Sequence, residues 1–239
     1  APERHRAECA IPPRDSLSGE PFLACAVRLL DRVFFRLGSE DYAVTNETYG
    51  LATMQKRHVR LVGETIRFDY PAKHGKRQVR AVVDPVAIEV VGKLKRRRGG
   101  GDELLAFKQA GRWCDLRSVD VNEYIKDVTG AGYSAKDFRT WNATVLAAVE
   151  VAGSHEEARS RAARKRAVSR AVERVAIYLG NTPAVCRASY IAPRVFDRFD
   201  AGATIADAIG DGNLELPAAQ SRVERAVLDL LTDEDPSSA

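Results

Sequence analysis

The sequence predicts a mainly helical protein with one small three-stranded antiparallel sheet near its start. Three runs between residues 57 and 83 alternate apolar with basic residues, and this period of two is typical of strands. Most of the remaining chain carries apolar residues at helical spacing between capping residues and glycines. The chain has 239 residues, of which 45% are hydrophobic and 29% charged, so it can bury a core as one large domain or two small lobes.

The first predicted helix covers residues 20–37 and stops at Gly38. The stretch from there to about Leu51 is predicted to be a loop. The three strands are expected at about 57–62, 65–70 and 77–83, with turns marked by Gly63 and by Pro71 to Gly75.

Helices are predicted for most of the chain after the sheet. Asp84 can cap a helix that begins at Pro85 and runs to the basic cluster Lys93–Arg98, and glycines 99–101 then interrupt the chain. Further helices are expected at 118–130, 135–153 and 155–179. The Thr182-Pro183 segment, a short helix and a last amphipathic helix near 218–231 complete the prediction.

Cysteine usage and hydropathy favour a cytoplasmic protein. Cys9, Cys25, Cys114 and Cys186 lie far apart without a CxxC pair, which predicts reduced thiols. No apolar stretch approaches 18 residues and no signal-peptide pattern is present, so we expect no membrane insertion. We interpret the polar residues 1–19 as the end of a linker in a fragment cut from a longer protein.

The charges of the chain are strongly segregated. Residues 55–113 hold 15 Lys and Arg against 6 Asp and Glu, a net of +9, whereas residues 198–239 hold 3 against 9, a net of −6. Clustered cations gain affinity by releasing counterions from phosphates, so a polyanion such as nucleic acid is a candidate partner. A solvated charged surface is the alternative explanation.

Four short motifs place reactive side chains at helix ends or turns. Each side chain alone also fits a structural role, such as a carbonyl-capping arginine, a solvated lysine, a surface pair or a core tyrosine. The candidates are Arg36 in FFRLG, Lys73 in YPAKHGK, Lys136 and Arg139 in AKDFRTW, and Asn181 and Tyr190 in LGNTPAVCRASY.

Taken together and in this order, the motifs resemble the active-site blocks of type IB DNA topoisomerases, in particular the small bacterial and poxvirus-like enzymes. The resemblance runs from about residue 20 to about residue 200 and includes the stretches YGLATMQKRHV and DVNEYIKDVTG. It implies the type IB topoisomerase or tyrosine recombinase-like catalytic fold for residues 20–239. It also implies that the N-terminal β-rich clamp domain of such enzymes is absent from this chain.

The resemblance assigns a role to each motif in the ATP-independent relaxation of supercoils. Tyr190 matches the nucleophile that forms a 3′-phosphotyrosyl intermediate. Arg36 and Arg139 match the arginines that clamp the non-bridging oxygens, and Lys73 matches the general acid for the leaving 5′-oxygen. Asn181 stands where poxvirus and eukaryotic relatives have a histidine, so we expect it to donate a hydrogen bond to the phosphate without proton transfer.

The partner implied by the resemblance is duplex DNA, and we therefore expect the protein to be associated with the nucleoid. Lys136 is assigned a phosphate contact, and we expect Tyr42, Lys76 and Arg57 to contact DNA as well. We expect a monomer that needs no ATP, nucleotide cofactor or metal ion, as in the relatives.

Two alternatives remain open. A tyrosine recombinase or integrase uses a related fold, but usually carries a histidine two residues before its second arginine, where this chain has Asp137. A non-catalytic duplex-DNA-binding module is the other alternative, and the joint presence of Tyr190, Arg36, Arg139 and Lys73 argues against it.

Overall fold

The computed structural model describes residues 19–130, 132–155, 157–210 and 217–232. The chain divides into two compact units, Ala1–Arg139 and Thr140–Ala239, which we call the first and the second unit. The boundary falls within one helix, α6 (Ala135–Ala152). All of the predicted N-terminal segment except Gly19 lies outside the described residues.

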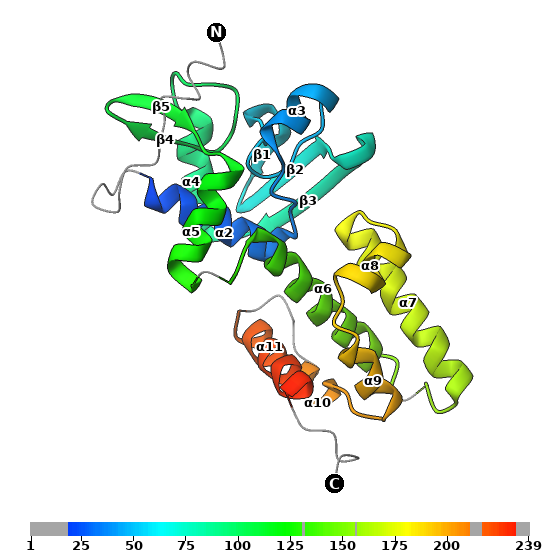
Figure 1. Cartoon of the computed structure of the whole chain (residues 1–239). Coiled ribbons are helices and arrows are strands. Elements are labelled where there is room, and N and C mark those ends of the chain that lie inside the picture. The colour runs from blue at the N-terminus through cyan, green and yellow to red at the C-terminus, as the bar shows by residue number, and fades with distance from the viewer. Residues whose placement is uncertain (1–18, 131, 156, 211–216, 233–239) are drawn as a thin grey trace. The chain divides into compact units, whose positions relative to one another are not determined.

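The first unit contains the predicted three-stranded antiparallel sheet, which is confirmed. Its strands β1 (Val59–Val62), β2 (Thr65–Pro71) and β3 (Arg77–Val83) lie side by side in chain order (Figure 1). In the register of this sheet Phe68 of β2 lies opposite Val59 of β1 and Arg80 of β3. Because side chains alternate along a strand, Ile66, Phe68 and Tyr70 of β2 share one buried face.

The helices of the first unit are α2 (Glu20–Val33), α3 (Glu40–Asn46), α4 (Pro85–Arg96) and α5 (Ser118–Thr129). Asp84 caps α4 as predicted, since its carboxylate accepts a hydrogen bond from the Ala87 amide at 2.9 Å. The same carboxylate accepts a 2.6 Å hydrogen bond from Arg28 of α2. This ion pair joins α2 to the start of α4.

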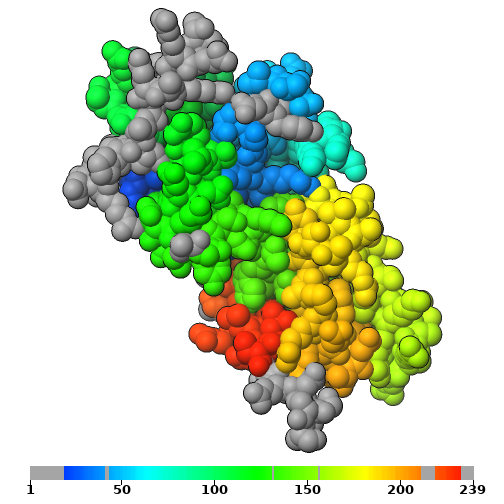
Figure 2. Space-filling view, in the orientation of Figure 1, coloured from blue at the N-terminus to red at the C-terminus, as the bar shows by residue number. Residues whose placement is uncertain are grey.

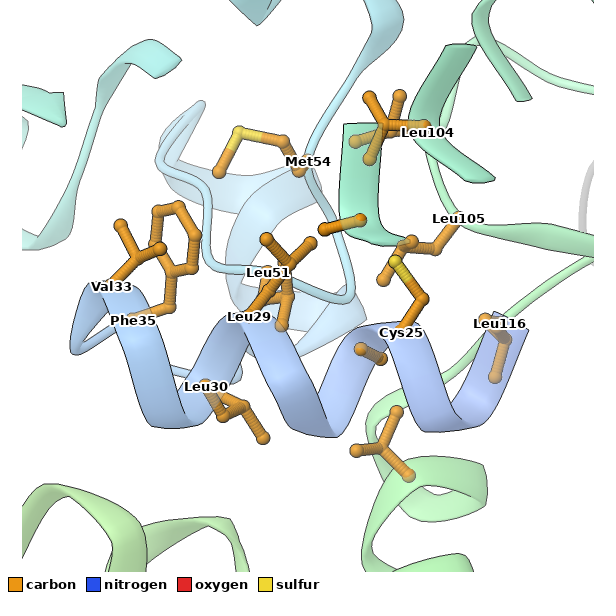
Figure 3. Close-up of a cluster of buried hydrophobic side chains, with 14 of the residues drawn as sticks. Cys25, Leu29, Leu30, Val33, Phe35, Leu51, Met54, Leu104, Leu105 and Leu116 are labelled. Carbon is orange, nitrogen blue, oxygen red and sulfur yellow. The ribbon is translucent and has the colours of Figure 1, made fainter. Parts of the chain in front are cut away.

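The apolar face of α2 supplies the centre of the first unit's core. Figure 3 shows Leu29 of α2 beside Leu51, with Met54, Leu104 and Leu105 on the same side of the helix. These side chains are almost fully buried and come from separate stretches of the chain. Their burial is the main source of stability for this unit.

The structure corrects four expectations in the first unit. Helix α2 ends at Val33 instead of residue 37, and the predicted loop before Leu51 contains α3. A second antiparallel sheet, formed by β4 (Ala106–Gln109) and β5 (Arg112–Asp115), follows the three glycines. Cys114 is disulfide-bonded, contrary to the predicted reduced thiol, whereas Cys25 and Cys186 are buried thiols.

The described residues of the second unit form helices joined by turns and contain no strand. After α6 it contains α7 (Arg161–Leu179), α8 (Pro183–Ser189), α9 (Arg194–Asp200), α10 (Ala206–Ile209) and α11 (Pro217–Thr232). Helix α7 packs against α8 and α9, and α11 packs against α9 and α10 (Figure 1). The predicted helix at 155–179 begins only at Arg161, because Ser160 caps it by accepting a hydrogen bond from the Ala163 amide. Among the described helices, none combines the length and the apolarity needed to cross a lipid bilayer.

Candidate active site

Arg36 lies just beyond the end of α2, in a segment whose backbone is held from several sides. Helix α2 stops because Phe34 adopts a left-handed conformation with φ of 61°. Phe35 then turns into the core, where its ring meets that of Phe68 edge to face with centroids 4.8 Å apart. The carbonyl of the half-buried Arg36 accepts a 2.8 Å hydrogen bond from the Leu51 amide.

A close approach of two glycines fixes the same segment next to the YGLAT stretch. A Cβ atom on Gly50 would lie 2.5 Å from the Cα atom of Gly38 and 2.7 Å from the carbonyl oxygen of Arg36. The Gly50 amide donates a 3.0 Å hydrogen bond to Thr53 Oγ1. The YGLAT stretch therefore supports the backbone that carries Arg36.

Arg139 is bound to the segment that precedes Arg36. It lies on the second turn of α6, is only 5% exposed, and donates a hydrogen bond from its guanidinium to the Phe34 carbonyl. Residues 34 and 139 are far apart in the chain but meet within the first unit. One short segment thus carries Arg36 and also binds Arg139.

The guanidinium groups of both arginines lie near Tyr70. Burial raises the pKa of the Tyr70 phenol to about 12, and the charges of Arg80, Arg139 and Arg36 act in the opposite direction. The phenol is therefore neutral at physiological pH although three cations lie near it. The positive charges of these three arginines act on the same part of the first unit, which is suited to binding an anion such as a phosphate.

Lys73 is exposed at the tip of the β2–β3 hairpin, as predicted. The hairpin is closed by a 2.9 Å hydrogen bond from the Ala72 amide to the Lys76 carbonyl. Below the tip, Arg77 binds Asp69 through two hydrogen bonds of 2.7 and 2.6 Å. This hydrogen bonding to Arg77 holds the pKa of Asp69 below its usual range. Hydrogen bonds therefore fix the backbone below the hairpin tip, while the Lys73 side chain is exposed to solvent.

Lys136 and Arg139 lie one turn apart on α6 but have different surroundings. Lys136 is exposed, whereas Arg139 is buried. Asp137 accepts hydrogen bonds from the amide and the hydroxyl of Ser134, at 2.8 and 2.7 Å. The residue that stands in place of the recombinase histidine is thus engaged in capping its own helix.

Two other expected DNA contacts, Arg57 and Lys76, are exposed in the first unit. Arg57 donates a 3.3 Å hydrogen bond to the Tyr49 hydroxyl. Tyr42 is part of α3, but its side chain lies outside the described residues. Among the described residues, no group of three or more His, Cys, Asp or Glu side chains could hold a metal ion.

The second unit carries Asn181 and Tyr190 at either end of α8. Helix α7 ends at Gly180, whose φ of 64° turns the chain, and the Asn181 amide donates to the Ala176 carbonyl at 3.0 Å. Thr182 then caps α8 by accepting a hydrogen bond from the Val185 amide. Tyr190 directly follows the last residue of α8 and is half-buried.

The structure therefore brings Arg36 and Arg139 together in the first unit and places Lys73 on a hairpin of that unit. Asn181 and Tyr190 belong to the second unit. Sequence reasoning did not single out Tyr70 and Arg80, which join the arginine group. The register of the hairpin was the available signal, because it pairs Arg80 of β3 with Phe68 of the buried face of β2.

Comparisons with known proteins identify the family of this chain. Residues 14–202 match the family model described as eukaryotic DNA topoisomerase I, catalytic core. DNA topoisomerase 1B of Acanthamoeba polyphaga mimivirus is 26% identical over 163 residues, which cover 65% of this chain and 48% of the relative. DNA topoisomerase 1 beta of Arabidopsis thaliana is 26% identical over 125 residues, or 52% of this chain and 13% of the relative. DNA topoisomerase 1 of Daucus carota is 29% identical over 125 residues, or 52% of this chain and 15% of the relative.

The chain thus spans about half the length of the viral relative and a smaller part of the plant relatives. These relatives come from a virus and from plants, so they give no support to a specifically bacterial origin. The family match covers all the motifs from Arg36 to Tyr190. The chain belongs to the family of the eukaryotic DNA topoisomerase I catalytic core.

Proposed function

We propose that this chain is the catalytic part of a type IB DNA topoisomerase that relaxes supercoils without ATP. Within the family, the observation that carries the proposal is the shared anchoring of Arg36 and Arg139 at residues 34–36. Two arginines that are anchored at one segment can direct their guanidiniums to the non-bridging oxygens of a single phosphodiester and neutralise their charge.

In the proposed reaction the phenolic oxygen of Tyr190 attacks the phosphorus, and the bond from phosphorus to the 5′-oxygen breaks. The products are a 3′-phosphotyrosyl ester and a free 5′-hydroxyl. Tyr190 loses its proton to solvent, and Lys73 gives a proton to the leaving oxygen. The reverse reaction reseals the strand after rotation, so the energy of the phosphodiester is retained in the ester.

The remaining residues act on binding and orientation. Arg36 and Arg139 stabilise the charge that develops on the phosphate in the transition state. Asn181 offers an amide NH₂ to the same phosphate, a donor whose charge does not change with pH. Tyr42, Arg57, Lys76 and Lys136 contact the DNA backbone, which gives affinity without sequence preference.

We also assign DNA contact to the exposed side of α7. Lys165, Arg166 and Arg170, which we call the α7 basic group, are exposed on this helix. Figure 2 shows the yellow-green atoms of α7 at the surface of the second unit. Two neighbouring arginines are already bound, Arg174 to Glu150 at 3.0 Å and Arg164 to the Asp200 carbonyl at 2.7 Å. The exposed cations of the α7 basic group are suited to binding phosphates instead.

The test is formation of a covalent adduct on a nicked duplex in the presence of a metal chelator and without ATP. The wild-type chain should become attached to the 3′ end of the cleaved strand, and Tyr190→Phe should abolish the adduct. Tyr133→Phe is the matched control, since Tyr133 is a 57% exposed tyrosine to which the proposal assigns no role. Absence of a wild-type adduct would contradict the proposal.

Two further outcomes separate the alternatives. Strand exchange between two specific sites would favour a recombinase. Binding of duplex DNA without any cleavage by the wild-type chain would favour the non-catalytic module. Plasmid relaxation is then measured on the same preparations, because relaxation requires cleavage and resealing together.

A further inference from the structure

Thr144 is a buried residue on α6 whose hydroxyl contacts the backbone at Tyr190 and directly after it. It is 2% exposed and belongs to the second unit, as Tyr190 does. Its Oγ1 atom accepts a 3.1 Å hydrogen bond from the Ala192 amide. The same oxygen lies 2.8 Å from the Thr140 carbonyl and 3.4 Å from the Tyr190 carbonyl.

The geometry assigns each hydrogen bond of this hydroxyl. A threonine has one proton to donate, and the shorter distance indicates that Thr140 receives it. Bonding to Thr140 within the same helix fixes the orientation of the hydroxyl. One lone pair then points at the Ala192 amide, and the Tyr190 carbonyl lies within reach of the same proton as a second, longer acceptor.

The backbone around Tyr190 is also fixed from the side of α8. The amides of Tyr190 and Ile191 both donate to the Cys186 carbonyl, at 3.0 and 3.2 Å. Cys186 is fully buried and Ile191 is 4% exposed, so this side is anchored in the core. Thr144 supplies the anchor on the other side, immediately after the tyrosine.

We propose that Thr144 is a positioning residue for the nucleophile Tyr190, acting by fixing the backbone from residue 190 to residue 192 against α6. This inference rests on the proposed function of Tyr190. Thr144 makes no contact with DNA in this proposal and acts only through the tyrosine backbone. The effect belongs to the cleavage step, because the tyrosine must reach the phosphorus in line with the leaving oxygen.

Replacing the hydroxyl by a methyl group would leave the partly buried Ala192 amide without its acceptor. A buried donor without a partner is costly, so the chain after Tyr190 is expected to shift toward another acceptor or toward solvent. A displacement of about 1 Å at a reacting group can lower a rate by about 100-fold. Thr144→Val keeps the shape of the side chain and removes only the hydrogen bonds.

The experiment compares Thr144→Val and Thr144→Ser with a matched control, Thr129→Val. Thr129 of α5 also donates to a carbonyl one helical turn back, that of Ile125, at 2.7 Å. The control therefore removes a similar intrahelical hydrogen bond that has no link to the tyrosine. For each variant we would measure thermal unfolding, DNA affinity and the single-turnover rate of adduct formation, at a temperature where all are folded.

Thr144→Val is expected to slow adduct formation by about 100-fold with DNA affinity unchanged. Thr144→Ser keeps the hydroxyl and should stay within about threefold of wild type, as should Thr129→Val. Hydrogen exchange of the Ala192 amide should speed up in Thr144→Val and stay slow in Thr144→Ser.

A Thr144→Val rate close to that of the wild type would overturn the proposal, as would an equal loss in Thr129→Val. If Thr144→Val does not fold, the serine variant is decisive, because a loss above about tenfold there shows that the hydroxyl is not the acting group. A wild-type chain that forms no adduct at all would instead refute the proposed function of Tyr190.

Discussion

Gly50→Ala is the substitution that most directly tests how the YGLAT stretch supports Arg36. The added Cβ atom would meet Gly38 at 2.5 Å and the Arg36 carbonyl oxygen at 2.7 Å. All these neighbours are backbone atoms, so no side-chain rotation can relieve the contact. The segment that carries Arg36 must therefore move away from residue 50.

The size of the movement follows from these distances. Carbon atoms in contact prefer separations of about 3.5 to 4.0 Å, so the segment must shift by about 1 Å. Such a shift at a catalytic group is expected to lower the cleavage rate by about 100-fold. Overpacking of this kind typically destabilises a protein by about 1–3 kcal/mol. For a chain of this size that corresponds to a melting temperature lowered by roughly 2–12 °C.

The assay is single-turnover adduct formation together with thermal unfolding. Gly132→Ala is the matched control, since a Cβ atom there would meet no other atom within 4 Å. Gly50→Ala should retain DNA affinity while losing cleavage, because Arg36 acts mainly in the transition state. A Gly50→Ala chain that cleaves at the wild-type rate would refute the link between this glycine contact and Arg36.

Three further predictions concern the hairpin, the α7 basic group and a buried histidine. Lys73→Ala should slow cleavage by about 100-fold or more on normal DNA, but only a little on DNA with a 5′-bridging sulfur, because a sulfur leaving group needs no acid. Asp69→Asn should show the same pattern more weakly. Equal slowing on both substrates excludes the acid role. Replacing the α7 basic group by three glutamines should make DNA binding less dependent on salt. The slope of the logarithm of the affinity against the logarithm of the salt concentration should fall by about 0.9 for each phosphate that is no longer bound, and an unchanged slope contradicts the assignment. Burial lowers the pKa of His58, so its contribution to folding stability is complete above its ordinary pKa and is lost as the pH falls through the lowered value. The melting temperature should therefore depend less on pH between pH 7.5 and pH 5 in His58→Gln, but not in His74→Gln, which is an exposed control. An equal pH dependence of the melting temperature in the two variants counts against this explanation.

The sheet could be predicted from the sequence because its signals are local. Alternating apolar and basic residues defined β1, β2 and β3, and Gly63 and Gly75 occupy turn positions with positive φ, at 56° and 69°. Helix caps were equally local, as the contact of Asp84 with the Ala87 amide shows. Propensity and short-range hydrogen bonding determine such features, so a single sequence contains them.

The end of α2 could not be predicted because contacts distant in sequence determine it. Apolar periodicity continues through Phe34 and Phe35, and nothing local favours a left-handed phenylalanine. The helix ends there because Phe35 packs on the sheet and Arg139 binds the Phe34 carbonyl. The α3 helix was missed for a related reason, since Glu40 at its start accepts hydrogen bonds from Ser118, 78 residues away.

The motif residues of the candidate site were found by resemblance, but the neighbouring residues that interact with them were not. The sequence placed Arg36 and Arg139 near helix ends and Lys73 at a hairpin tip. The structure agrees for Lys73 and Arg139, whereas Arg36 lies beyond the end of α2. Tyr70 and Arg80 looked like ordinary strand residues, because only the pairing of β2 with β3 shows which residues lie across from each other. Thr144 looked like an ordinary helix residue for the same reason, because its partner at Ala192 is 48 residues away.

The arginine pair depends on a backbone conformation that is unfavourable by itself. A non-glycine residue at φ of 61° is strained by about 1–3 kcal/mol, so Phe34 keeps it only because its surroundings require it. Burial of Phe35 in the core holds the Phe34 backbone in this conformation on one side, and the hydrogen bond from Arg139 to the Phe34 carbonyl holds it on the other. The core packing of Phe35 therefore aims the Phe34 carbonyl at Arg139 and directs Arg36 out of the core. Since both arginines depend on this one turn, substitutions that disturb Phe35 should impair them together, and the two arginines should behave as a coupled pair in double-mutant cycles.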